Sequence, residues 1–80
     1  MNQQSHDQSH SVPFMDAFLS TPKWGTFFYY AKNREELITL FEALLDLGFA
    51  VIEQPHELFS DAFLAKMMDN KGREILLKSR

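Results

Sequence analysis

The chain has 80 residues, no cysteine, 14% aromatic side chains and a formal net charge of −3. This length allows one domain with a modest core. The absence of cysteine excludes a disulfide scaffold, a zinc–thiolate site and a thiol nucleophile, and it favours a cytoplasmic location. The acidic balance disfavours nonspecific binding to nucleic-acid phosphates, and the apolar runs are too short for a transmembrane helix.

The N-terminal residues 1–11 are polar after Met1, and we expect a disordered tail there, followed by a single small domain over residues 12–80. Pro13 suits the first turn of a short helix in which Phe14 and Phe18 share one face. The Ser-Thr-Pro sequence at 20–22 predicts its end. So short a helix requires tertiary contacts to form.

A strand, a helix and a second strand are predicted over residues 26–53. The sequence TFFYYA at 26–31 is rich in strand formers. Asn33 suits a helix N-cap with Glu36 three residues on, and Gly48 suits the left-handed position after the helix end. Between them runs an apolar stripe at helical spacing, formed by Leu37, Leu40, Phe41 and Leu44. The sequence FAVIE then predicts a strand that ends at Pro55, which completes a βαβ unit.

The stretch from Pro55 to Gly72 fits a second long helix, in which Phe59, Phe63 and Met67 share one face. The alternative is a strand over 61–69 that turns back through the sequence DNKG. We favour the helix because Ala, Lys, Met and Asp are poor strand formers. A final strand is predicted over 73–79. The expected fold is a small layered α/β or α+β domain in the order α-β-α-β-α-β.

Two stretches resemble parts of known families. The sequence GTFFYYAKNREEL resembles the third strand and second helix of an RNA-recognition module, which would imply base stacking on strand aromatics. It departs from that module at Thr26, where an aromatic is expected, and at Phe27, where glycine or alanine is expected. The sequence FFYYAKNREELITLFEALLDLGFAVI is similar to the strand–helix–strand of bacterial proteins that bind and inhibit ribonuclease E, which implies a βαβ unit in a binding protein.

No constellation of residues indicates catalysis, a cofactor or a metal. The glycines stand singly at predicted element boundaries, so no glycine-rich phosphate loop exists, and no serine lies in a nucleophile-elbow pattern. His56 is interpreted as a residue of a first helical turn, and the acidic residues as solvated. We therefore expect a protein that is not an enzyme and has no cofactor.

The four consecutive aromatic residues of the first strand raise the main functional question. Alternation places Phe27 and Tyr29 on one face and Phe28 and Tyr30 on the other. The predicted 33–47 helix covers one face, and the second face is either covered by the short N-terminal helix, which we favour, or left exposed. If it is exposed, it forms an apolar patch of the kind found at interfaces. The candidate partner-binding residues are Trp24, Phe28, Tyr30, Met67 and Met68.

Two functions fit these features. The first is a small noncatalytic bacterial or phage protein that binds another protein as an inhibitor, adaptor or regulatory subunit, with homodimer formation as one option. The second is a nucleic-acid-binding accessory protein that uses the strand aromatics and the basic C-terminus. The second hypothesis requires the basic residues to gather beside Tyr29 or Tyr30. The candidate basic patch comprises Lys66, Lys71, Arg73, Lys78 and Arg80.

Overall fold

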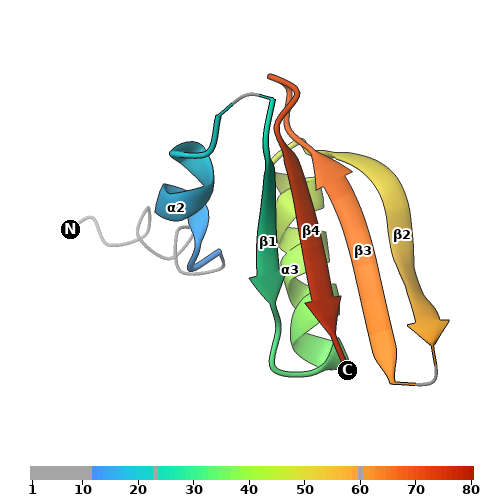
Figure 1. Cartoon of the computed structure of the whole chain (residues 1–80). Helices are drawn as coiled ribbons and strands as arrows, with labels where there is room; N and C mark the ends of the chain where they lie inside the picture. Colours follow the sequence, from blue (N-terminus) through green and yellow to red (C-terminus); the bar gives the residue numbers. More distant parts are fainter. Residues whose placement is uncertain (1–11, 23, 60) are drawn as a thin grey trace.

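The computed structural model describes residues 12–22, 24–59 and 61–80, so the predicted N-terminal tail lies outside the described residues. The elements follow in the order α2 (Met15–Leu19), β1 (Thr26–Tyr30), α3 (Arg34–Asp46), β2 (Ala50–Phe59), β3 (Ala62–Met68) and β4 (Glu74–Ser79). Figure 1 shows a twisted sheet with α3 lying across one face and α2 beside β1.

The four strands form a mixed sheet in the order β1-β4-β3-β2. β1 pairs with β4 in parallel, and the pairs β4–β3 and β3–β2 are antiparallel. The expected layered α+β class is thus confirmed. The first predicted strand, at 26–31, and the last, at 73–79, are also confirmed as β1 and β4. β1 and β2 run in the same direction, as a βαβ unit requires, but at opposite edges of the sheet, because β3 and β4 lie between them.

The predicted helix over 55–72 is wrong, and the alternative strand over 61–69 is correct. The order is therefore α-β-α-β-β-β, with β2 and β3 forming a hairpin. Pro55 does not end β2, because β2 is an edge strand and its register shifts between Glu53 and His56, and proline is tolerated at edges and bulges. Residues four apart, such as Phe63 and Met67, share a face in both a helix and a strand. The alternating burial from Ala65 to Met68 is that of a strand.

Helix α3 has the predicted ends. The Asn33 side chain accepts a hydrogen bond from the Glu36 N–H at 2.8 Å, while the Glu36 carboxylate accepts from the Lys32 N–H at 2.6 Å, one residue beyond the usual capping box. At the other end, Phe49 N–H donates to the Leu44 carbonyl and Gly48 N–H to the Leu45 carbonyl, which is a Schellman motif. Both ends of the helix are therefore fixed by its own sequence.

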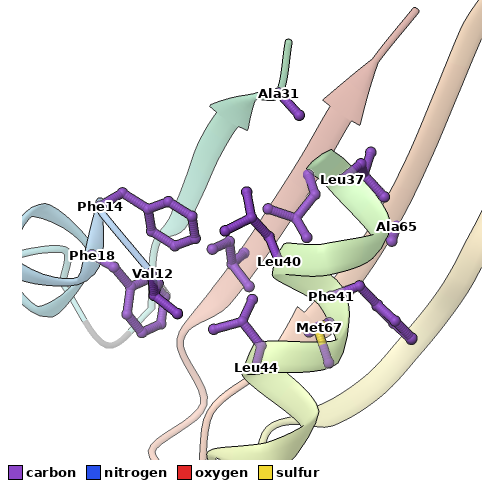
Figure 2. Close-up of a cluster of buried hydrophobic side chains, with 12 residues drawn as sticks. Val12, Phe14, Phe18, Ala31, Leu37, Leu40, Phe41, Leu44, Ala65 and Met67 are labelled. Carbon is purple, nitrogen blue, oxygen red and sulfur yellow. The ribbon is translucent and has the colours of Figure 1, made fainter. Parts of the chain in front are cut away.

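The core lies between α3 and the sheet face that α3 covers, as Figure 2 shows. The predicted stripe is buried, and it packs with side chains from β3 and β4. Buried members include Leu37, Leu40, Phe41, Leu44, Ala65, Met67, Ile75 and Leu77.

Helix α2 packs on the same side of the sheet as α3. Phe14 lies 5.5 Å from Phe27 and 4.7 Å from Tyr29, ring centre to ring centre, and buried Phe18 contacts Phe27 from the same side. The buried Arg73 guanidinium donates to the Leu19 carbonyl at 2.7 Å, lies over the Phe18 ring and pairs with Asp69 at 3.2 Å. The favoured prediction, that this helix covers the second face, is therefore wrong.

Leu44 and Leu45 provide a test of the core. Leu44 is fully buried and the neighbouring Leu45 is 41% exposed. Leu44→Ala is expected to lower the free energy of unfolding by about 2–5 kcal/mol, because the truncation leaves a cavity. Leu45→Ala is expected to stay within about 0.5 kcal/mol. Urea denaturation of both variants measures the difference, and equal losses would contradict this placement of the helix face.

Gly48 provides a test of the helix end. Its φ is +97°, and a Cβ added there meets no atom within 4 Å, so substitution is opposed by the backbone and not by crowding. Gly48→Ala is expected to cost about 1–2 kcal/mol of unfolding free energy. Gly48→Asn is expected to cost less, since asparagine tolerates the left-handed region better. Thermal melts compare the two, and a larger loss for Asn would contradict the argument.

Candidate interaction surface

The sheet face opposite α3 is covered by none of the described elements. Ile75 and Leu77 of β4 are buried toward α3, so Leu76 and Lys78 point to the other side. The strand register extends this face across all four strands. We call it the uncovered sheet face, and its members include Thr26, Phe28, Tyr30, Glu53, His56, Leu64, Lys66, Met68, Glu74, Leu76 and Lys78.

Exposed aromatic side chains lie along the β1 edge of this face. Phe28 is 64% exposed and Tyr30 is 72% exposed, and Trp24, in the turn before β1, is 87% exposed. The alternation predicted from the sequence is confirmed, since Phe27 and Tyr29 pack toward α2. We call these three exposed residues, two on the uncovered sheet face and one in the turn before it, the exposed aromatic patch.

The two methionines proposed from the sequence do not extend the aromatic patch. Met67 is fully buried in the core beneath α3, because it alternates with Lys66 and Met68 on β3, so its assignment to a binding surface is corrected. Met68 lies on the uncovered sheet face and is half-buried, but its strand partners are Ala50 and Glu74, at the far end from Tyr30.

Charged pairs occupy the middle of the uncovered sheet face. Lys66 Nζ lies 3.5 Å from Glu74 Oε1, which also accepts a hydrogen bond from Thr26 Oγ1 at 3.4 Å. On the β2 edge, His56 Nε2 lies 3.0 Å from Glu53 Oε1. Exposed pairs of this kind contribute little to stability. They do give this face both signs of charge beside its apolar groups.

His56 is held as a hydrogen-bond donor. Its Nε2 faces the Glu53 carboxylate, and its Nδ1 lies 3.3 Å from the Glu57 carbonyl oxygen. Two acceptors favour an imidazolium, which has two N–H donors. The pKa of His56 is raised above its ordinary value of 6.5, mainly by the hydrogen bond to Glu53. Burial lowers this pKa, and the hydrogen bond to the Glu57 carbonyl raises it further.

The predicted basic patch is divided between the two ends of the sheet. Lys78 lies on the uncovered sheet face with its Nζ 5.8 Å from the centre of the Tyr30 ring, and Arg80 follows at the same end. Lys66 is paired with Glu74. Lys71 lies in the β3–β4 turn at the opposite end, and Arg73 is buried against Asp69 and α2. Only Lys78 and Arg80 therefore meet the requirement of proximity to Tyr30.

Sequence reasoning missed two features of this surface. Lys32 lies beside Tyr30, Lys78 and Arg80, because β1 and β4 are parallel and end together. Glu53 and His56 meet because the register shift between them places both on one face of β2. The Glu53–His56 pair could have been found if residues 55–59 had been predicted as a strand. The position of Lys32 beside Lys78 and Arg80 requires knowledge of the β1–β4 pairing, which alternation within one strand does not reveal.

The described residues were also compared with the requirements of a metal site and of a membrane span. In residues 12–22, 24–59 and 61–80, no three His, Asp or Glu side chains lie close enough together to hold a metal ion. Within the same ranges, no helix has the length and apolar character to cross a membrane. The chemical groups exposed on this surface are aromatic rings, the His56–Glu53 pair, and the cations where β1 and β4 end.

Comparison with known proteins identifies the fold. No protein-family model and no curated protein sequence matches the chain. The solved structure of the hypothetical protein SA1046 from S. aureus is 18% identical with a TM-score of 0.60, and the match covers 69% of this chain and 48% of that one. A glyoxalase/bleomycin resistance protein/dioxygenase family enzyme from Burkholderia phytofirmans PsJN is 15% identical with a TM-score of 0.63, covering 89% and 58%.

These comparisons show that the chain shares its α+β fold with both solved structures. The chain spans about half the length of the two solved structures that it matches, at 48% and 58%. A shared fold at such identities does not carry an activity with it, since one fold hosts many functions. Function must therefore be argued from the surface of this chain.

The Glu53–His56 pair gives a pH prediction. The folded chain binds the His56 proton more tightly than the unfolded chain, so the pair contributes stability below the unfolded pKa of about 6.5 and loses it as pH rises through the folded value. We expect the NMR titration of His56 to have its midpoint above 6.5. Glu53→Gln should move the midpoint down. An unchanged midpoint in that variant would contradict the assigned cause.

Proposed function

We propose that the chain is a noncatalytic protein that acts by binding another protein through the uncovered sheet face, as an inhibitor, adaptor or regulatory subunit. The observation that supports the proposal most is the exposed aromatic patch of Trp24, Phe28 and Tyr30. Tyrosine and tryptophan are enriched at interfaces, and rings of this size are the usual anchors of binding energy.

The arrangement of the surrounding charges also supports protein binding. The Lys66–Glu74 pair lies beside Leu76 in the middle of the face, with Phe28 on the β1 side and the Glu53–His56 pair on the β2 side, so apolar groups and charges of both signs share one surface. Interfaces between proteins likewise combine aromatic anchors with polar and charged groups. The partner of such a face presents apolar side chains between charges of both signs.

A second copy of the same chain is one partner that this surface allows. A two-fold dimer needs a self-complementary surface, in which each group meets its counterpart across the axis. The uncovered sheet face has apolar rings and both signs of charge, which are the groups that such a surface uses. Sedimentation of the purified chain at several concentrations separates a homodimer from a complex with a different protein.

Nucleic-acid binding is the second candidate. Lys78 over the Tyr30 ring, with Arg80 and Lys32 at the same end, combines an exposed ring with cations, as platforms for single-stranded nucleic acids do. The other basic residues point elsewhere or are paired, and the net charge is −3. We therefore rank this function below protein binding.

Alanine variants of Trp24, Phe28 and Tyr30 test the proposed function. Because these rings are exposed, each variant should keep its unfolding free energy within about 0.5 kcal/mol of the parent. A partner isolated from native lysate, purified and titrated against each variant should bind about 2 kcal/mol or more weakly when an anchor ring is lost. Leu47→Ala, an exposed apolar residue after α3, is the control and should bind as the parent does.

Two results would contradict protein binding through this face. One is a purified partner that binds all three variants with parental affinity. The other is a nucleic acid as the ligand, with affinity that falls steeply as salt rises and falls further in Lys78→Met.

A further inference from the structure

A cavity of about 470 Å³ opens where β1 and β4 end side by side. Its wall combines apolar groups from Tyr30, Ala31 and Ala62 with the charged residues Lys32, Lys78, Arg80 and Asp61. The volume lies within the range of small-molecule sites, which is about 300–1,000 Å³. The ends of adjacent parallel strands are also where open sheets commonly place ligands.

The charge of this cavity differs from that of the chain. Three cations and one carboxylate line it, a balance of +2 in a chain whose net charge is −3. Among the described residues, Arg34, Lys66 and Arg73 form ion pairs with carboxylates, and the remaining cations are Lys32, Lys71, Lys78 and Arg80. Four cations therefore have no ion pair within the described ranges. Three of these four line one cavity.

The backbone around the cavity is fixed by hydrogen bonds. Ala31 N–H donates to the Lys78 carbonyl at 2.7 Å, which joins the ends of the two strands. The Arg80 carbonyl accepts from Arg34 Nε at 3.0 Å and from Ser79 Oγ at 3.4 Å. The three cationic side chains thus extend from a hydrogen-bonded backbone, and none of them forms an ion pair within the described residues.

The exposed ring at the cavity indicates the rest of the ligand. Tyr30 is 72% exposed, and the Lys78 ammonium lies 5.8 Å from its ring centre, near the outer limit of about 6 Å for a cation–π contact. Aromatic rings favour offset or edge-on contacts with other rings. A ligand with a flat ring beside its anionic group satisfies both Tyr30 and the cations.

We propose that this cavity is a binding site for a small aromatic anion, whose carboxylate pairs with Lys78, Lys32 and Arg80 and whose ring packs against Tyr30. The site is formed by the chain alone, so it does not depend on the proposed protein partner. Since its attraction is electrostatic and the cavity opens to solvent, the affinity falls as salt rises.

Titration of the isotope-labelled chain with 2-naphthoate tests the site by NMR. We expect saturable shifts at Tyr30, Lys78 and their neighbours, with a Kd of about 1 mM or tighter, a value typical of a small ligand with few contacts. Naphthalene-2-carboxamide, which lacks the charge, and inorganic phosphate, which lacks the ring, should each bind at least tenfold more weakly.

Variants locate the binding. Lys78→Met and Tyr30→Ala should each weaken 2-naphthoate binding at least tenfold while the melting temperature is retained, since Tyr30 is exposed and methionine keeps the apolar stem of the half-buried Lys78. Lys71→Met is the matched control, because Lys71 also lacks an ion pair but lies at the other end of the sheet, and it should bind as the parent does.

Several outcomes would overturn the proposal. No saturable shift at the cavity at about ten times the expected Kd rejects the site. Equal affinity for the carboxamide rejects the anion, and equal affinity for phosphate rejects the ring. A short single-stranded RNA that competes at the same residues with a much lower Kd would assign the cations to nucleic acid instead.

Discussion

The packing of one helix on one face of the sheet determines the rest of this structure. The α3 stripe, from Leu37 to Leu44, buries Ile75 and Leu77 of β4 and Ala65 and Met67 of β3. In a chain of 80 residues, the apolar surface that such a layer removes from water is a main source of stability. Every strand residue that alternates out of this layer is consequently left on the opposite side.

Arg73 adds the second constraint. Its guanidinium connects Asp69 of the β3–β4 turn to the Leu19 carbonyl, and a cation at a helix C-terminus is favoured by the helix dipole. With Phe14 and Phe18 packed on Phe27 and Tyr29, α2 is held beside α3. The helices therefore share one face, and the rings of Phe28 and Tyr30 remain available on the other.

Local signals were sufficient where the sequence determines structure by itself. Asn33, Glu36 and Gly48 fix the ends of α3 through contacts within a few residues, so the helix and its buried stripe were predictable. Pro55 and the alternation from Phe63 to Met67 were ambiguous, because an edge strand tolerates proline and residues four apart share a face in both a helix and a strand. The sheet had to be known before the hairpin became evident.

The candidate site shows the same division. Alternation within one strand placed Phe28 and Tyr30 on the face opposite Phe27 and Tyr29, but it did not reveal that α2 leaves that face exposed. The meeting of Lys32 with Lys78 and Arg80 depends on a pairing between segments nearly 50 residues apart, as the Thr26–Glu74 contact illustrates with a separation of 48. No local pattern encodes a contact of that range.

The central position of β4 has a consequence for how the chain is made. β4 is synthesised after the other three strands, yet it lies between β1 and β3 and supplies the only strand neighbour of β1 within the described residues. The capped helix and the β2–β3 hairpin can form while the chain is still growing. β1, which carries the aromatic residues, cannot pair with its neighbouring strand until residues 74–79 have left the ribosome. Pairing over such a distance is slow, and unpaired strands are prone to aggregate in the interval. The interval before β4 inserts is therefore when a nascent chain most needs protection by chaperones.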